Sequence, residues 1–137
     1  LNHHGIATRL IALHEHNERR IAPQVLALLD SGKSVALVSD AGTPGISDPG
    51  AHLVAACRKA GHAVVPVPGA NAAIAALSAS GIAASHFLFY GFLPAKGGER
   101  RRELAALAAL PYALVFYEAP HRVAESIDDM RAAFGAD

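Results

Sequence analysis

Short apolar runs alternate with helix-like segments along the first two thirds of the chain, and this alternation limits the possible folds. Near-continuous apolar runs of this length are typical of strands that are covered on both faces of a parallel sheet. The strand-like runs lie at 8–14 (where a helix is also possible), 34–39 and 62–67, and the segments that form helices lie at 17–33, 48–61 and 68–81. This order predicts an α/β fold built from parallel βαβ units with right-handed crossovers.

A second α/β unit is expected towards the C-terminus, where aromatic residues become more frequent. The sequence predicts strands at 86–93 and 112–118, a polar basic loop at 94–103, and helices at 104–110 and 120–135. We therefore expect an N-terminal domain over residues 1–91 and the beginning of a C-terminal domain over 92–137.

Composition excludes several classes of protein. The 137 residues are 52% hydrophobic and 18% charged, which predicts a globular chain with a buried core. The formal net charge is zero, so there is no overall basic field to attract nucleic acid. Cys57 is the single cysteine, which excludes an internal disulfide and is typical of the reducing cytoplasm. We expect neither a membrane span nor a signal peptide in this sequence.

Two loops rich in glycine and proline follow neighbouring apolar runs. They read "SDAGTPGISDPG" from residue 39 and "VPVPGANAA" from residue 65. Ligands of open parallel sheets bind beyond the carboxyl ends of the strands, so we expect both loops to lie side by side and wall a cleft. The simpler alternative is that glycine and proline only make tight turns.

The two aspartates of the first loop have different predicted roles. Asp48 is expected to cap the following helix, with Pro49 at its first position. Asp40 follows the predicted strand directly, where its carboxylate either binds a ligand or bonds to amides of its own loop.

The first loop closely resembles the signature of the bacterial ribosomal RNA small-subunit methyltransferase I family, within the tetrapyrrole methylase superfamily. "LIALHEHNE", "VPVPGANAAIAALSASG", "FLFYGFLPAKGGERR" and "LVFYEAPHR" resemble further family segments in the same order. The resemblance implies methylation of a cytidine 2′-hydroxyl in small-subunit ribosomal RNA by a cytoplasmic homodimer. It also implies S-adenosyl-L-methionine as the cofactor, bound in a cleft between two α/β domains.

The resemblance assigns cofactor-binding residues by motif. Gly42, Thr43 and Pro44 occupy the place of a Gly-Asp-Pro motif in the wider superfamily, with threonine replacing the aspartate. The full set implied is Asp40, Ala41, Gly42, Thr43, Pro44, Ile46, Pro68, Gly69, Asn71, Ala72, Tyr117 and Glu118.

The family opens with a strand and a glycine-rich loop that have no counterpart in this sequence, which starts at Leu1. We therefore expect the chain to be an internal piece of a longer protein. Without that loop, we expect these residues to be inactive by themselves.

Methyl transfer to a ribose hydroxyl requires alignment of the acceptor oxygen and benefits from a general base. Asp40 and Glu118 are the candidates, and the sequence does not choose between them. His14 and His16 lie two residues apart, but no cysteine or carboxylate accompanies them at a recognised metal-ligand spacing, so we expect no metal.

Ribosomal RNA would need local basic charge. We expect it to contact the basic residues Lys96, Arg100, Arg101, Arg102 and Arg122. A solvated helix start is an equal alternative for the cluster at 96–102. Two other functions also remain open: a methylase acting on small tetrapyrrole-type molecules, and a ligand-binding α/β module without activity.

Overall fold

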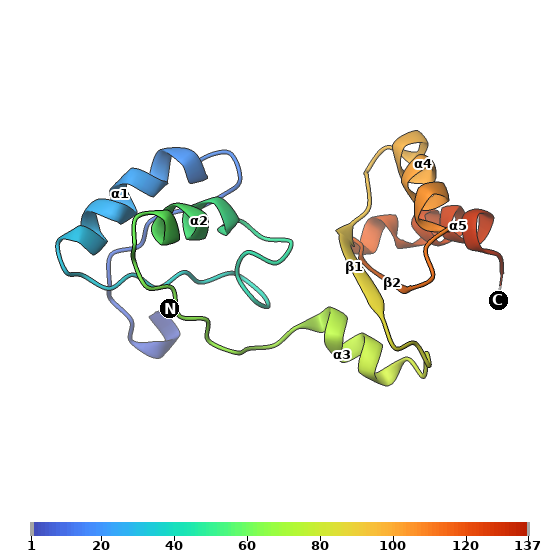
Figure 1. Cartoon of the computed structure of the whole chain (residues 1–137), viewed down its shortest axis with the longest axis horizontal. Coiled ribbons are helices and arrows are strands. Elements are labelled where there is room, and N and C mark those ends of the chain that lie inside the picture. The colour runs from blue at the N-terminus through green and yellow to red at the C-terminus, as the bar shows by residue number, and fades with distance from the viewer. Residues whose placement is uncertain (1, 137) are drawn as a thin grey trace. The chain divides into compact units, whose positions relative to one another are not determined.

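A computed structural model describes residues 2–136, which form two compact units (Figure 1). Unit 1 ends at Ala70 and unit 2 begins at Asn71. This division falls earlier than the domain boundary expected at 91/92. The reason is that the strand Phe87–Phe92 pairs with a strand of unit 2 and so belongs to that unit.

Unit 1 is built on two helices that pack against each other. It contains the 3-10 turn η1 (Asn2–His4), α1 (Glu18–Asp30) and α2 (Ala51–Lys59). Ile21, Ala22 and Val25 lie three or four residues apart on one face of α1, as an amphipathic helix requires. They form the core of unit 1 together with Leu53 and Cys57 of α2.

The strands predicted in unit 1 are wrong. Within residues 2–70 the segments 8–14, 34–39 and 62–67 carry no strand pairing. Val65 is 79% exposed and Val67 is 82% exposed, whereas a strand covered on both faces would bury both side chains. Apolar β-branched residues favour an extended backbone, but a strand exists only where a neighbour accepts its hydrogen bonds, and these segments have no such neighbour here.

Unit 2 contains a parallel βαβ arrangement. Its elements are α3 (Ala72–Ala79), β1 (Phe87–Phe92), α4 (Gly97–Leu107), β2 (Ala113–Tyr117), the 3-10 turn η2 (Pro120–Arg122) and α5 (Val123–Phe134). β1 and β2 pair in parallel, with a register shift between Phe89 and Gly91. The strands predicted at 86–93 and 112–118 are therefore confirmed, as is the α/β class.

α4 starts earlier than the sequence predicts. The stretch 94–103 was expected to be a loop, yet its residues from Gly97 onward are helical, and the helix ends at Leu107. Leu104 and Leu107 are buried, which places one face of α4 in the core of unit 2. The basic residues continue the same helix because arginine and glutamate are good helix formers.

The start of α2 also differs from expectation, and the residue before α1 bonds to the preceding segment. Asn17 precedes α1 but does not cap it: its side chain accepts from His14 N at 2.8 Å and donates to Ala12 O at 3.0 Å. α2 begins after Gly50, so Asp48 and Pro49 do not start it as predicted. Among residues 2–136, no helix combines the length and the apolar character needed to cross a membrane.

Candidate functional site

The first glycine-rich loop runs from Asp40 to Gly50 and is tied to the second one within unit 1. Thr43 Oγ1 donates to the carbonyl oxygen of Ala70 at 3.4 Å. A Cβ on Gly42 would lie 3.7 Å from the same oxygen, which is an ordinary van der Waals contact. The two loops therefore meet at Ala70, but residues 2–70 do not form the parallel sheet at whose edge they were expected, and the cleft stays a prediction.

The residues of the first loop are mostly available to a ligand. Asp40, Ala41, Gly42 and Ile46 are exposed, and Thr43 and Pro44 are half-buried. The carboxylate of Asp40 takes part in none of the hydrogen bonds found among the described residues. It is therefore not the cap of its own loop, and its oxygens are open to solvent.

The end of the loop is held by a residue that the sequence did not single out. Glu18 is 4% exposed, and its Oε1 accepts from Gly50 N at 2.6 Å. Its Oε2 accepts from His52 N at 3.0 Å, in the first turn of α2. This side chain from the start of α1 replaces the cap expected from Asp48.

The second loop enters α3, where the candidate residues already have partners within unit 2. Pro68 and Gly69 are exposed at the end of unit 1. Asn71 caps α3, because its Oδ1 accepts from Ile74 N at 3.1 Å. Ala73 N donates to the hydroxyl of Tyr117 at 3.3 Å, which brings the start of α3, including Ala72, to the end of β2.

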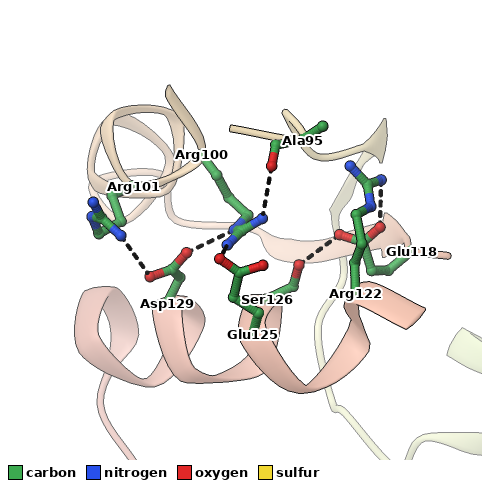
Figure 2. Close-up of polar contacts among 8 residues, drawn as sticks. All are labelled: Ala95, Arg100, Arg101, Glu118, Arg122, Glu125, Ser126 and Asp129. Carbon is green, nitrogen blue, oxygen red and sulfur yellow. Dashed lines mark hydrogen bonds and ion pairs between the residues drawn. The ribbon is translucent and has the colours of Figure 1, made fainter. Parts of the chain in front are cut away.

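Glu118 follows β2 and lies at the centre of a closed polar network, drawn in Figure 2. Its Oε2 accepts from Ser126 Oγ at 2.6 Å, and its Oε1 accepts from Ala119 N at 2.7 Å and pairs with Arg122. Burial raises the pKa of Glu118, but the hydrogen bonds from Ser126 and Ala119 and the charge of Arg122 outweigh it. The net pKa is below its ordinary value, so Glu118 stays ionised and is a weak base.

Arg100 is the centre of a second cluster in Figure 2. Its side chain is 0% exposed, its Nε donates to Asp129 at 2.7 Å, and its Nη2 lies 3.0 Å from Glu125. The Nη2–Glu125 contact is an ion pair without hydrogen-bond geometry. Glu125 itself is 67% exposed, so the guanidinium lies only one side chain below the surface. Arg100 joins α4 to α5 and offers no surface to RNA.

The other predicted RNA contacts are more accessible. The side chain of Lys96 is 81% exposed and that of Arg101 is 61% exposed, and each touches one carboxylate at more than 3 Å. Arg102 is exposed. Arg122 is 19% exposed and is engaged by Glu118. The structure therefore places Lys96, Arg101 and Arg102 on the surface and Arg100 inside.

The histidine pair does not gather further ligands. The rings of His14 and His16 lie 6.1 Å apart. Within the part of the chain that is described, no three His, Cys, Asp or Glu side chains lie close enough to hold a metal ion.

Four acidic or hydroxyl side chains of these networks were not revealed by the sequence: Glu18, Glu125, Ser126 and Asp129. Acidic residues in a first helical turn normally interact with their own helix, so Glu18 gave no signal of a partner 32 positions away. Ser126 follows Glu118 by eight residues across a turn and a helix start, a spacing that no regular pattern connects.

The sequence profile of the Tetrapyrrole (Corrin/Porphyrin) Methylases matches residues 4–137. The chain belongs to this family. Among curated relatives of this chain are proteins named "Ribosomal RNA small subunit methyltransferase I" from Escherichia coli O157:H7 and Pseudomonas aeruginosa. They are 54% and 55% identical over 98% of the chain. A protein of the same name from Haemophilus influenzae is 51% identical over the whole chain.

The chain spans about half the length of these relatives: 47%, 48% and 48% of them, respectively. The resemblance to the ribosomal RNA small-subunit methyltransferase I family, first seen in the loop motifs, is confirmed by these matches along nearly the entire chain.

Proposed function

We propose that this chain is part of an S-adenosylmethionine-dependent methyltransferase that acts on the 2′-hydroxyl of a cytidine in small-subunit ribosomal RNA. The observation that carries the proposal is the identity of more than half of the residues to relatives with that RNA in their name. Membership of a methylase family supports the general reaction. The location in the cytoplasm and the homodimer rest on the resemblance alone.

The cofactor is proposed to bind the residues that the loop motifs assign. Bound S-adenosylmethionine supplies an electrophilic methyl group on a sulfonium ion. The fit is supported by the exposed residues Asp40, Ala41, Gly42 and Ile46 of the loop, and by the φ of 73° at Gly42, which a side chain would strain. Asn71, Ala72, Tyr117 and Glu118 of unit 2 are proposed as cofactor contacts on the resemblance alone.

Of the two candidate bases, Asp40 is favoured. The lowered pKa of Glu118 and the three donors on its oxygens leave it little capacity to accept a proton. The carboxylate of Asp40 is exposed and has no described partner, so an acceptor hydroxyl can reach it. We propose that Glu118 instead holds Arg122, whose guanidinium remains partly exposed for a phosphate.

The test is transfer of labelled methyl groups from S-adenosylmethionine by the full-length protein. The acceptor is the small ribosomal subunit from a strain that lacks the modification, and the product is located by nuclease digestion. We expect label on a cytidine ribose. Label only on a tetrapyrrole-type molecule would support the small-molecule methylase instead. Cofactor binding without any transfer would support a ligand-binding module.

Asp40→Asn is the variant that tests the base. We expect it to lower kcat by about a hundredfold while the protein still binds the RNA. Glu118→Gln serves as the comparison, and a larger loss of kcat in that variant would reverse the assignment.

A further inference from the structure

Glu18 is a buried carboxylate whose partners are backbone amides. It is 4% exposed, and among the described residues no cationic side chain forms an ion pair with it. A buried carboxylate must be compensated, and here the compensation comes from two N–H groups, those of Gly50 and His52. Both belong to the junction between the 40–50 loop and α2.

No side chain from the junction itself caps α2. α2 is preceded by Gly50, which has no side chain to cap the free amides of the first turn. The nearest local candidate, Asp48, is exposed and makes no capping bond to α2. The positive end of the α2 dipole therefore faces the carboxylate of Glu18, which is the favourable arrangement for a negative charge.

Of the two long-range hydrogen bonds that hold the loop, the one to Glu18 is the shorter. The bond from Gly50 N to Glu18 Oε1 is 2.6 Å long, whereas the bond from Thr43 Oγ1 to Ala70 O is 3.4 Å long. Between these two hydrogen bonds, residues 46–48 of the loop are exposed. A change at Glu18 therefore alters where the loop ends and which way its backbone faces.

We infer that Glu18 is a positioning residue for the 40–50 loop, and that it sets the affinity for the methyl donor without touching it. The inference rests on the proposed function, because that function makes the loop a cofactor-binding element. Glu18 acts through Gly50 and His52 only.

The test compares Glu18→Gln with Val25→Ala in the full-length protein. Glutamine keeps the size of the side chain but has one acceptor oxygen, and its amide nitrogen must face an N–H group. Val25 is 4% exposed in the core between α1 and α2, so its truncation weakens the same helix pair without touching the loop. Both are measured at a temperature where circular dichroism shows them folded.

For Glu18→Gln we expect the Kd of S-adenosylmethionine to rise about tenfold by isothermal titration, because a charge-assisted hydrogen bond is lost. The KM of the donor should rise with it while kcat at saturating donor stays close to wild type. Val25→Ala should leave both constants near wild type. An equal rise in Kd in the two variants, or none in Glu18→Gln, overturns the inference.

Amide hydrogen exchange separates this inference from the proposed function. In Glu18→Gln, the amides of Gly50 and His52 should exchange about tenfold faster, while Val25→Ala should not single them out. Unchanged exchange at both amides would contradict the inference that Glu18 holds the end of the loop. A wild-type protein that does not bind S-adenosylmethionine overturns the proposed function. The exchange result then still decides whether Glu18 positions the loop.

Discussion

The two units hold their candidate residues in different ways. In unit 1 the glycine-rich loop is tied by a single carboxylate, Glu18, and a threonine hydroxyl, both bonded to backbone groups. In unit 2 the candidates near β2 are held by side chains of opposite charge, with Arg122 on Glu118 and Arg100 on Asp129. A loop tied through its backbone depends on glycine geometry, whereas a network of ion pairs depends on charge state. We therefore expect glycine substitutions to destabilise unit 1 and changes of charge to destabilise unit 2.

The largest expected effect is the removal of Arg100, because this leaves Asp129 half-buried and without its main partner. Asp129 is 12% exposed, and the hydrogen bond from Arg100 is the chief cause of its lowered pKa. For Arg100→Met we expect the melting temperature to fall by about 10 °C. Arg101→Met is the control, since Arg101 is 61% exposed and lies 3.4 Å from the same carboxylate. Similar falls in both variants would show that the buried position does not matter.

The next effect tests the dependence of unit 1 on glycine. Gly50 has a φ of 134°, and a Cβ there would lie 2.8 Å from Leu37 Cδ2. We expect Gly50→Ala to cost about 1–3 kcal/mol of unfolding free energy, measured by urea denaturation. Gly61→Ala is the matched control, because Gly61 also has a positive φ but open space around it. An equal cost in the two variants would assign the effect to φ alone.

The third effect concerns the exposed basic charge of unit 2. Reversing both exposed arginines, with Arg101→Glu and Arg102→Glu, should weaken binding of the ribosomal RNA substrate about tenfold and reduce its salt dependence. The Kd of S-adenosylmethionine should not change. The combined change of Arg58→Glu and Lys59→Glu, two exposed basic residues of α2, alters the net charge by the same amount in unit 1 and serves as the control. A comparable loss of RNA affinity in that control would mean that overall charge, not this surface, determines binding.

The smallest expected effect is a loss of stability in acid, caused by protonation of Glu118 in unit 2. Glu118 has a lowered pKa in the folded protein, so its ionised form stabilises the fold above its ordinary pKa of 4.5. That contribution is lost as the pH falls below this value and through the folded pKa. The melting temperature should fall between pH 7 and about pH 3.5, and it should fall less in Glu118→Gln. An identical acid loss in the variant would place the sensitive group elsewhere.

The sequence alone determined the features that depend on neighbouring residues. The apolar spacing on α1, the aromatic strands β1 and β2, and the glycine and proline loops are all local patterns, and the family signature lies in the same short segments. These features could be predicted because helix periodicity, strand propensity and turn chemistry act over about ten residues.

Only the tertiary structure decided which partner each polar or extended segment found. Arg100 and Asp129 are 29 residues apart, and Glu18 reaches Gly50 across 32. Neither pairing follows from a local pattern, so the burial of one arginine in a basic run and the distant cap of α2 were not predictable. The segments 34–39 and 62–67 show the same limit: their composition favours extension, but pairing into a sheet requires a neighbouring strand that composition does not specify.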